Sequence, residues 1–160
     1  MPLIFDDPDL GRIFYISRLH RLLRQLDNQI ETIAAEHGIE SPPECTTILL
    51  SLWQYGPMPL NPLAESVGES PAVVGRRVRK LVEQRFARRS VQPQAKRVEF
   101  LLTQAGYRQA EALIRLSPKM EEIYRSLDAE LGVDLAQTVE RLGRSLKARP
   151  LMARLSEPVD

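Results

Sequence analysis

The amino-acid sequence predicts a mainly α-helical chain that contains one small β-hairpin. Apolar residues recur at spacings of three and four over most of its length, which is the period of an amphipathic helix. The pattern changes to alternation only over residues 86–102, where two short runs flank the tip "QPQA". Basic residues are concentrated in and just before that hairpin. These observations predict apolar helices at both ends of the chain and a basic helix and hairpin between them.

Length and composition fit one compact domain, or one domain with a dimerising extension. The chain has 160 residues, of which 43% are hydrophobic and 27% are charged. No stretch approaches the roughly 18 apolar residues of a membrane span, and acids stand near the start, where a secretory signal carries bases. The single cysteine, Cys45, excludes an intrachain disulfide framework and fits a reducing compartment. We therefore expect a cytoplasmic protein that contacts no membrane.

Residues 10–37 are expected to form a long first helix, with Asp9 as its cap and Gly38 as its end. Its apolar positions are Leu10, Ile13, Phe14, Ile16, Leu19, Leu22, Leu23, Leu26, Ile30 and Ile33. A stripe this wide needs cover on more than one side, which indicates a partner chain. Residues 1–40 are therefore interpreted as an N-terminal dimerisation helix.

Two shorter helices are expected next. The stretch "ESPPECTTILLSLWQYG" predicts a helix that is capped by Ser41 and ended by Gly56. The expected buried face of this helix is Ile48, Leu49, Leu52 and Trp53. After a proline-rich turn, a short helix begins at about Asn61 and ends at Gly68. Its inward residues are expected to be Leu63, Ala64 and Val67.

The stretch "ESPAVVGRRVRKLVEQR" predicts the next helix, with Ser70 as its cap and Pro71 at the first helical position. Four residues share one apolar face: Val74, Val78, Leu81 and Val82. The opposite face carries Ala72, Arg76, Arg79 and Glu83, and one flank carries Val73, Arg77 and Lys80. Gly75 lies at the edge of the buried face, where we expect a neighbouring helix to approach closely.

Strands and further helices complete the chain. The runs "FARRSV" and "KRVEFLLT" predict a hairpin in which Val98, Phe100 and Leu102 share a face. Thr103 is a candidate cap for a helix that bends at Pro118 and continues through "KMEEIYRSLDAELG". A final helix repeats apolar residues at Leu135, Val139, Leu142 and Leu146. The tail after Pro150 is expected to be loosely held.

Positive charge is confined to one segment of an almost neutral chain. Residues 76–97 contain nine bases and one acid, so the segment carries +8, and the net charge of +1 leaves −7 for the rest of the chain. A protein that collects its bases in one place is suited to a polyanion. Because the bases continue from a helix into a hairpin, an ordinary solvated surface is the weaker interpretation.

A short helix, a turn, a capped basic helix and a basic hairpin together form a winged helix-turn-helix, expected over residues 41–104. The major groove of B-DNA admits one helix, whose N-terminal part faces the base edges. On this interpretation Ala72 and Val73 meet thymine methyl groups, and Arg76 reaches a guanine. The phosphate contacts would be Arg77, Arg79, Lys80 and the backbone N–H groups of Ser70 to Val73. The wing residues Arg88, Arg89, Lys96 and Arg97 would enter a minor groove or hold the backbone.

The order and spacing of these elements resemble the MarR family of bacterial transcription regulators. The resemblance covers roughly residues 10–148 and is carried by "LAESVGESPAVVGRRVRKL", by "VEFLLTQAG" and by "ESPPECTTILLSL". It implies an obligate homodimer held by the N-terminal helix and by residues 105–160, on a pseudo-palindromic operator in double-stranded DNA. It also implies a small aromatic or anionic effector in a crevice between the dimer helices and the winged domain, where Trp53 could lie. The resemblance favours a repressor that such an effector releases.

Two positions depart from the family pattern. The family has an acid and an arginine two apart at the wing tip, where this chain has Gln94 and Lys96. The family also favours glycine between the recognition helix and the wing, where this chain has Arg85. A non-glycine residue there is expected to adopt a strained turn.

Other functions receive less support from the sequence. Cys45 near a helix N-terminus could have a lowered pKa and act as the redox switch of the repressor, although a lone cysteine is usually a small buried hydrophobe. The basic winged segment could instead bind an acidic protein surface. His20 and His37 lie far apart without a cysteine cluster, so no metal or other cofactor is expected. No catalytic motif is visible, which indicates a non-enzyme.

Overall fold

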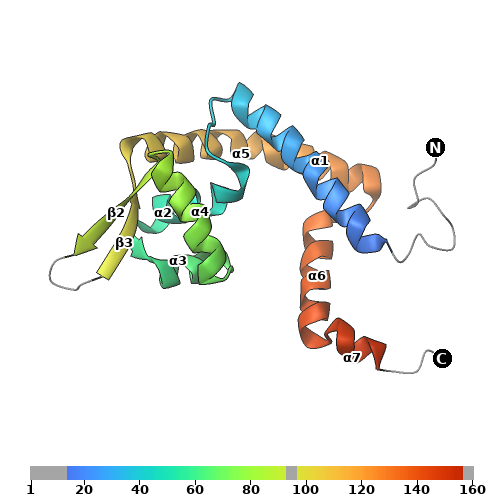
Figure 1. Cartoon of the computed structure of the whole chain (residues 1–160). Helices are drawn as coiled ribbons and strands as arrows, with labels where there is room; N and C mark the ends of the chain where they lie inside the picture. The colour runs from blue at the N-terminus through green and yellow to red at the C-terminus, as the bar shows by residue number, and fades with distance from the viewer. Residues whose placement is uncertain (1–13, 93–96, 157–160) are drawn as a thin grey trace. The chain divides into compact units, whose positions relative to one another are not determined.

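The computed structural model describes residues 14–92 and 97–156. The elements follow in the order α1 (Tyr15–Glu36), η2 (Pro43–Cys45), α2 (Thr46–Tyr55), β1 (Met58–Pro59), α3 (Leu60–Val67), α4 (Pro71–Glu83), β2 (Ala87–Gln92), β3 (Arg97–Leu102), α5 (Gln104–Leu131), α6 (Leu135–Ala148) and α7 (Leu151–Leu155) (Figure 1). The predicted mainly α-helical fold with a hairpin wing is confirmed. The chain divides into two compact units, Met1–Leu116 and Ser117–Asp160.

The core of the first unit lies among α2, α3, α4 and the sheet, which Figure 1 shows beside one another. The predicted inward residues of these helices are buried: Ile48, Leu49, Leu52, Leu63, Ala64, Val74, Val78 and Leu81. Trp53, which was expected on the buried face of α2, is instead 39% exposed. The helical period alone placed Trp53 with Leu49 and Leu52, but no neighbouring element covers its ring completely.

A third strand extends the predicted hairpin into a sheet of order β1-β3-β2. Strands β2 and β3 pair antiparallel from Ala87↔Leu102 to Gln92↔Arg97. Phe100 and Leu102 are buried on one face of β3, and Val98 packs against the core, as their alternation predicts. The prediction of a simple turn before α3 is wrong, because Met58 pairs with Phe100. A strand of two residues has no period of its own and forms only by that pairing.

The predicted cap of α2 at Ser41 is also wrong. The segment begins with a 3-10 turn at Pro43–Cys45, and the hydroxyl of Ser41 is buried without a hydrogen-bond partner among the described residues. The Ser41 N–H donates to Oε1 of Gln109 in α5 (3.1 Å), which also accepts from the Glu40 N–H (2.7 Å). Buried Gln109 therefore fixes the connection between α1 and α2 through a tertiary contact that no local pattern reveals.

Both ends of the chain differ in detail from the expected elements. Asp9 and the first positions of the expected N-terminal helix lie outside the described residues, and α1 ends before Gly38, as predicted. Helix α5 continues through Pro118. The prediction of a loosely held tail after Pro150 is wrong for Leu151–Leu155, which form α7. The Arg154 guanidinium stabilises it by donating to the carbonyl oxygens of Arg149 (2.9 Å) and Ser145 (3.0 Å).

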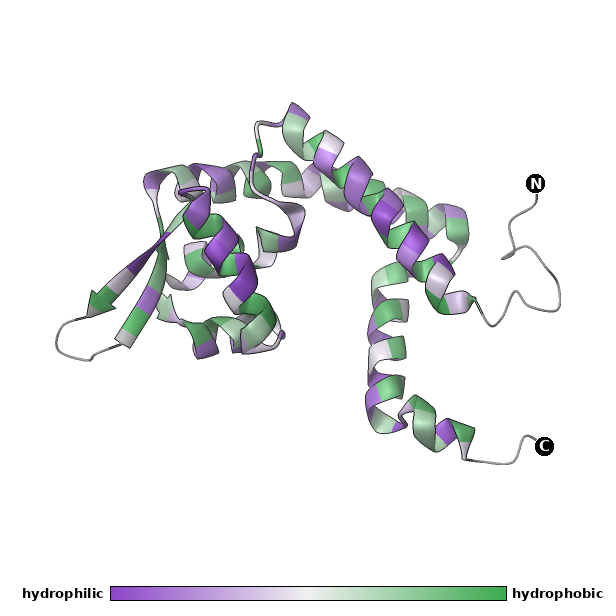
Figure 2. Ribbon diagram, in the orientation of Figure 1, coloured by the Kyte–Doolittle hydropathy of each residue, from purple (hydrophilic) through white to green (hydrophobic). Residues whose placement is uncertain are grey.

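The second unit leaves an apolar face uncovered. The structure describes every residue of α6, and none of them is buried. The predicted stripe is exposed at Leu135, Val139, Leu142 and Leu146, and α7 adds exposed Leu151, Met152 and Leu155. Figure 2 shows hydrophobic and hydrophilic residues alternating along the ribbon of these helices. A helix with this pattern buries its apolar side only against another surface.

Candidate nucleic-acid interface

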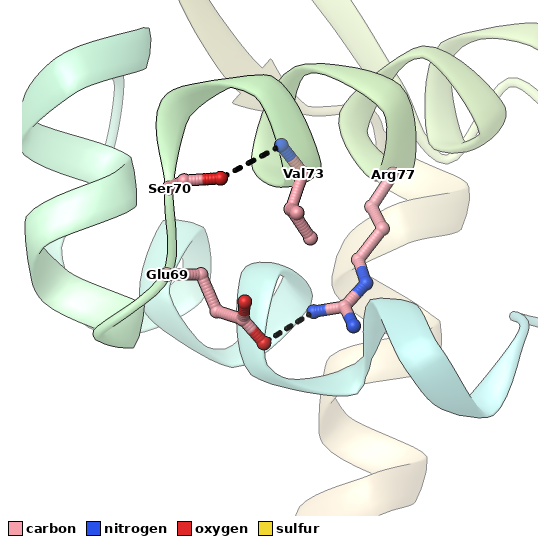
Figure 3. Close-up of polar contacts among 4 residues, drawn as sticks. All are labelled: Glu69, Ser70, Val73 and Arg77. Atoms are coloured by element: carbon pink, nitrogen blue, oxygen red, sulfur yellow. Dashed lines mark hydrogen bonds and ion pairs between the residues drawn. The ribbon is translucent and has the colours of Figure 1, made fainter. Parts of the chain in front are cut away.

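The turn between α3 and α4 is closed by backbone hydrogen bonds and a side-chain cap. Gly68 adopts a left-handed conformation (φ 70°), its N–H donates to Glu65 O (3.2 Å), and the Glu69 N–H donates to Ala64 O (3.1 Å). Helix α4 then begins with the predicted cap, because the Ser70 hydroxyl accepts from the Val73 N–H at 3.4 Å (Figure 3). The start of α4 is therefore held rigidly against the end of α3.

The predicted faces of α4 are confirmed. Val74, Val78 and Leu81 are fully buried and anchor the helix to the core. Ala72, Arg76 and Arg79 are exposed on the opposite side. The Nε of Arg79 donates to Gly75 O at 3.1 Å, which lays this side chain along the helix surface. Beside Gly75, the Leu60 side chain of α3 is at ordinary contact distance, 3.6 Å from where a Cβ would lie.

The two bases on the flank of α4 are paired with acids from outside the helix. Nη1 of Arg77 lies 3.1 Å from Oε1 of Glu69 (Figure 3), and Nζ of Lys80 lies 2.6 Å from Oε1 of Glu44 in η2. The hydrogen bond from Lys80 lowers the pKa of Glu44. Neither acid could be identified from the sequence, because Glu69 is eight residues from its partner and Glu44 is 36 residues from Lys80.

Cys45 lies beneath the same flank. Its side chain is fully buried, and Sγ donates to Arg77 O at 3.6 Å. Burial raises the pKa of the thiol to about 11. The expectation of a lowered pKa is therefore wrong, because loss of hydration outweighs the nearby bases and the helix terminus.

The turn from α4 into the wing shows the expected strain at Arg85. This residue has φ 63°, and it is the non-glycine residue with positive φ in the described chain. The Arg85 N–H donates to Val82 O (3.0 Å) and the Phe86 N–H to Leu81 O (2.8 Å), which is the pattern of a Schellman motif with Arg85 in the place of glycine. The Thr103 hydroxyl donates to Arg85 O (2.6 Å) and accepts from the Gly106 N–H (3.1 Å), so the predicted cap of α5 also braces this turn.

The wing separates two residues that the sequence grouped together. Arg89 pairs with Phe100 across the sheet, and Arg88 pairs with Leu101, so the two arginines point to opposite faces. Arg89 lines a shallow depression of about 380 Å³ together with Ala72, Gly75 and Arg79 of α4. Arg97 begins β3, while Gln94 and Lys96 lie outside the described residues. The structure thus brings Arg89, but not Arg88, beside the exposed face of α4.

Trp53 lines a second shallow depression of the first unit, about 360 Å³ in volume, with Tyr55 and Ile114 among its neighbours. Within residues 14–92 and 97–156 the structure shows no cluster of three metal-binding side chains, and Nδ1 of His37 lies 2.8 Å from its own helix at Ile33 O. No helix in the same part of the chain is both long and apolar enough to cross a membrane.

The solved structures that resemble this chain include two transcriptional regulators and a heme sensor protein. A MarR family transcriptional regulator from Silicibacter pomeroyi is 23% identical, with 92% of this chain and 97% of that chain covered and a TM-score of 0.54. A probable transcriptional regulator from Pseudomonas aeruginosa is 25% identical, over 80% of this chain and 96% of that chain, with a TM-score of 0.54. The heme sensor protein PefR from Streptococcus agalactiae, in complex with heme, is 16% identical over 87% and 96% of the two chains, with a TM-score of 0.60.

No protein-family model and no curated protein sequence matches the chain. The structural similarities show that the chain has the MarR-type winged helix-turn-helix fold, as the sequence predicted. Its structural neighbours are regulators rather than enzymes.

Proposed function

We propose that this protein is a dimeric, sequence-specific DNA-binding transcription regulator of the cytoplasm, a repressor that a small-molecule effector releases. One observation carries the proposal. Ala72, Arg76 and Arg79 form an exposed face of α4, and three fully buried residues on the other side fix its direction. That arrangement is what a recognition helix requires, since its outer face must reach base edges while its inner face is anchored.

Each exposed base has a proposed role. Arg76 reads a guanine, and Ala72 leaves space for a thymine methyl group. Arg79 and Arg89 border one depression and hold phosphates on either side of it. Of the backbone N–H groups from Ser70 to Val73, Pro71 has none and Val73 donates to Ser70, so only part of the proposed backbone phosphate site is available. Arg88, Lys96 and Arg97 are proposed to contact DNA from the rest of the wing.

The exposed apolar helices support a homodimer. Helices α6 and α7 expose seven large apolar side chains, and α1 exposes Tyr15, Ile16, Leu22 and Leu23. Exposed apolar area of this extent is characteristic of an interaction surface. Two-fold symmetry then predicts a pseudo-palindromic operator with half-sites about one helical turn apart.

The effector site is proposed beside Trp53. Aromatic and aliphatic side chains line the depression together with the polar residues Ser51, Gln54 and Ser66, which suits a small aromatic ligand, including one that carries an anionic group. Quenching of Trp53 fluorescence by a ligand that also releases DNA would support this assignment. In Trp53→Leu, which lacks the single tryptophan of the chain, release of DNA should then require more ligand. Release that is unaltered in Trp53→Leu would contradict it.

Operator binding tests the function directly. A gel shift with the DNA upstream of the gene should give a discrete complex that survives competitor DNA, whereas a module that binds acidic proteins should not. Affinity should fall with salt at a log–log slope of about −0.9 per phosphate neutralised. Arg76→Ala should relax base preference at a cost of about 1–3 kcal/mol. Salt-insensitive binding, or unchanged base preference in this variant, would contradict the proposal.

A further inference from the structure

The four bases of α4 fall into two chemically distinct sets. Arg76 and Arg79 are exposed and form no ion pair among the described residues. Arg77 and Lys80 each contact a carboxylate of another element. The side chain of Arg77 is only 24% exposed and lies back along α4 toward Glu69 at the start of the helix (Figure 3). A count of bases therefore overstates the positive charge that the helix presents to a polyanion.

Both carboxylates are held in place by the backbone that carries them. Glu69 lies between Gly68, which closes α3, and the capping residue Ser70, and its N–H donates to Ala64 O at 3.1 Å. Glu44 lies inside the 3-10 turn of η2, where the Cys45 N–H donates to Pro42 O at 2.8 Å. The Sγ of Cys45 in turn contacts Arg77 O, which ties η2 to α4. The backbone at each acid is therefore already in the conformation that lets the carboxylate contact its base.

We propose that Glu69 and Glu44 compete with DNA phosphates for Arg77 and Lys80, and so limit the sequence-independent affinity of the recognition helix. A carboxylate and a phosphate present the same kind of anionic oxygen to a guanidinium or an ammonium group. An intramolecular acid at 3.1 Å or 2.6 Å is already in contact, whereas a phosphate must displace it. This inference rests on the proposed DNA binding. It identifies two acids that lower the affinity of the recognition helix for DNA.

The physical consequence is a smaller number of neutralised phosphates. Each base that stays with its acid on DNA removes one phosphate contact, and so about 0.9 from the salt slope. Exposed ion pairs are worth little, so each acid should change the affinity by about 1.4- to five-fold. Such a change is a small share of the binding free energy for the operator. It is a larger share for DNA of unrelated sequence, which is bound more weakly.

The test measures binding of the full chain to a duplex of unrelated sequence at several salt concentrations. Glu69→Gln should raise the affinity about 1.4- to five-fold and increase the magnitude of the salt slope by about 0.9. Glu65→Gln is the matched control, because it removes the same charge four residues away, from an exposed side chain for which the described chain shows no ion pair. Glu44→Gln provides an independent second variant.

A double-variant cycle identifies the partner through which each acid acts. In an Arg77→Gln background, Glu69→Gln should change affinity no more than Glu65→Gln does, and Glu44→Gln should behave in the same way in a Lys80→Gln background. The inference is overturned if Glu69→Gln and Glu65→Gln have equal effects on affinity and slope, if the effect persists without Arg77, or if Glu69→Gln weakens binding. Absence of DNA binding by the unaltered protein would instead overturn the proposed function, and this inference with it.

Discussion

Gly106 in the first turn of α5 lies directly against the backbone carbonyl of Phe86, at the start of the wing. A Cβ at position 106 would overlap the carbonyl oxygen and carbon of Phe86. The same oxygen accepts a hydrogen bond from the N–H of Thr103 (3.0 Å) and lies 3.2 Å from the hydroxyl oxygen of that residue. Two segments that are twenty residues apart are therefore docked backbone to backbone, and this contact positions the base of the wing relative to α4.

Gly106→Ala and Gly75→Ala should have opposite effects on the free energy of unfolding, although both replace a helical glycine. Alanine at 106 must displace the Phe86 backbone, so we expect a loss of about 3 kcal/mol or more. Alanine at 75 would meet Leu60 at an ordinary 3.6 Å and should gain up to about 1 kcal/mol from helix propensity. Urea unfolding measures both, and a loss of stability in Gly75→Ala together with a neutral Gly106→Ala would contradict the geometry.

Arg85→Gly should stabilise the protein by about 0.5–1 kcal/mol. The left-handed conformation of Arg85 costs about 1–2 kcal/mol, and the greater freedom of glycine in the unfolded chain offsets part of the gain. Thermal or urea unfolding provides the measurement. Arg85→Ala is the control, because alanine keeps the strain and should change stability by less than about 0.5 kcal/mol. Equal stabilisation by both variants would show that removal of charge, not relief of strain, is responsible.

Arg89→Ala should weaken DNA binding more than Arg88→Ala. The two variants remove the same charge from adjacent positions, but only Arg89 lies on the sheet face beside Ala72 and Arg79. Titration of a labelled duplex should show a larger loss of affinity and a larger decrease in the salt slope, by up to about 0.9, for Arg89→Ala than for Arg88→Ala. Equal losses would contradict this ranking and would mean that both faces of the wing contact DNA to the same extent.

The thiol of Cys45 should react very slowly with disulfide reagents in the native protein at pH 8. With its pKa raised to about 11 from an ordinary 9.0, the native thiolate fraction is about a hundredfold lower than in the unfolded chain, and burial slows access further. The unfolded thiol ionises first as pH rises, so the contribution of Cys45 to stability is present below pH 9 and is lost between about pH 9 and 11.

Reagent labelling with and without urea checks the reactivity of Cys45. Fast labelling of the folded protein, or oxidant-dependent release of DNA that Cys45→Ser abolishes, would favour the redox alternative instead.

Leu142→Glu should convert the proposed dimer into a monomer or a much weaker dimer. The substitution places a charge on the exposed apolar side of α6, where burial against a partner would be costly. Gln137→Glu adds the same charge on the opposite side of this helix and should leave the molar mass unchanged. Light scattering after size-exclusion chromatography distinguishes these outcomes. An unaltered dimer in Leu142→Glu would place the interface elsewhere.

Features that depend on neighbours within one or two helical turns could be predicted from the sequence. The Ser70 cap, the buried face of α4 with Val78 at its centre, and the exposed position of Arg76 all follow from the helical period and from cap chemistry. The left-handed turn at Arg85 was implied by the resemblance to the MarR family, which favours glycine at this position.

Other features were decided only when distant segments met. Strand β1 exists because Met58 pairs with Phe100, Gly106 is required because Phe86 lies against it, and Cys45 has a raised pKa because the core covers it. The same holds for the charge of the recognition helix, where acids from η2 and from the α3–α4 turn pair with two of its four bases. The chain by itself determines which residues a helix can present, since periodicity is local. Which of those residues remain available depends on packing, because contact energies depend on distances in space and not on separation along the sequence.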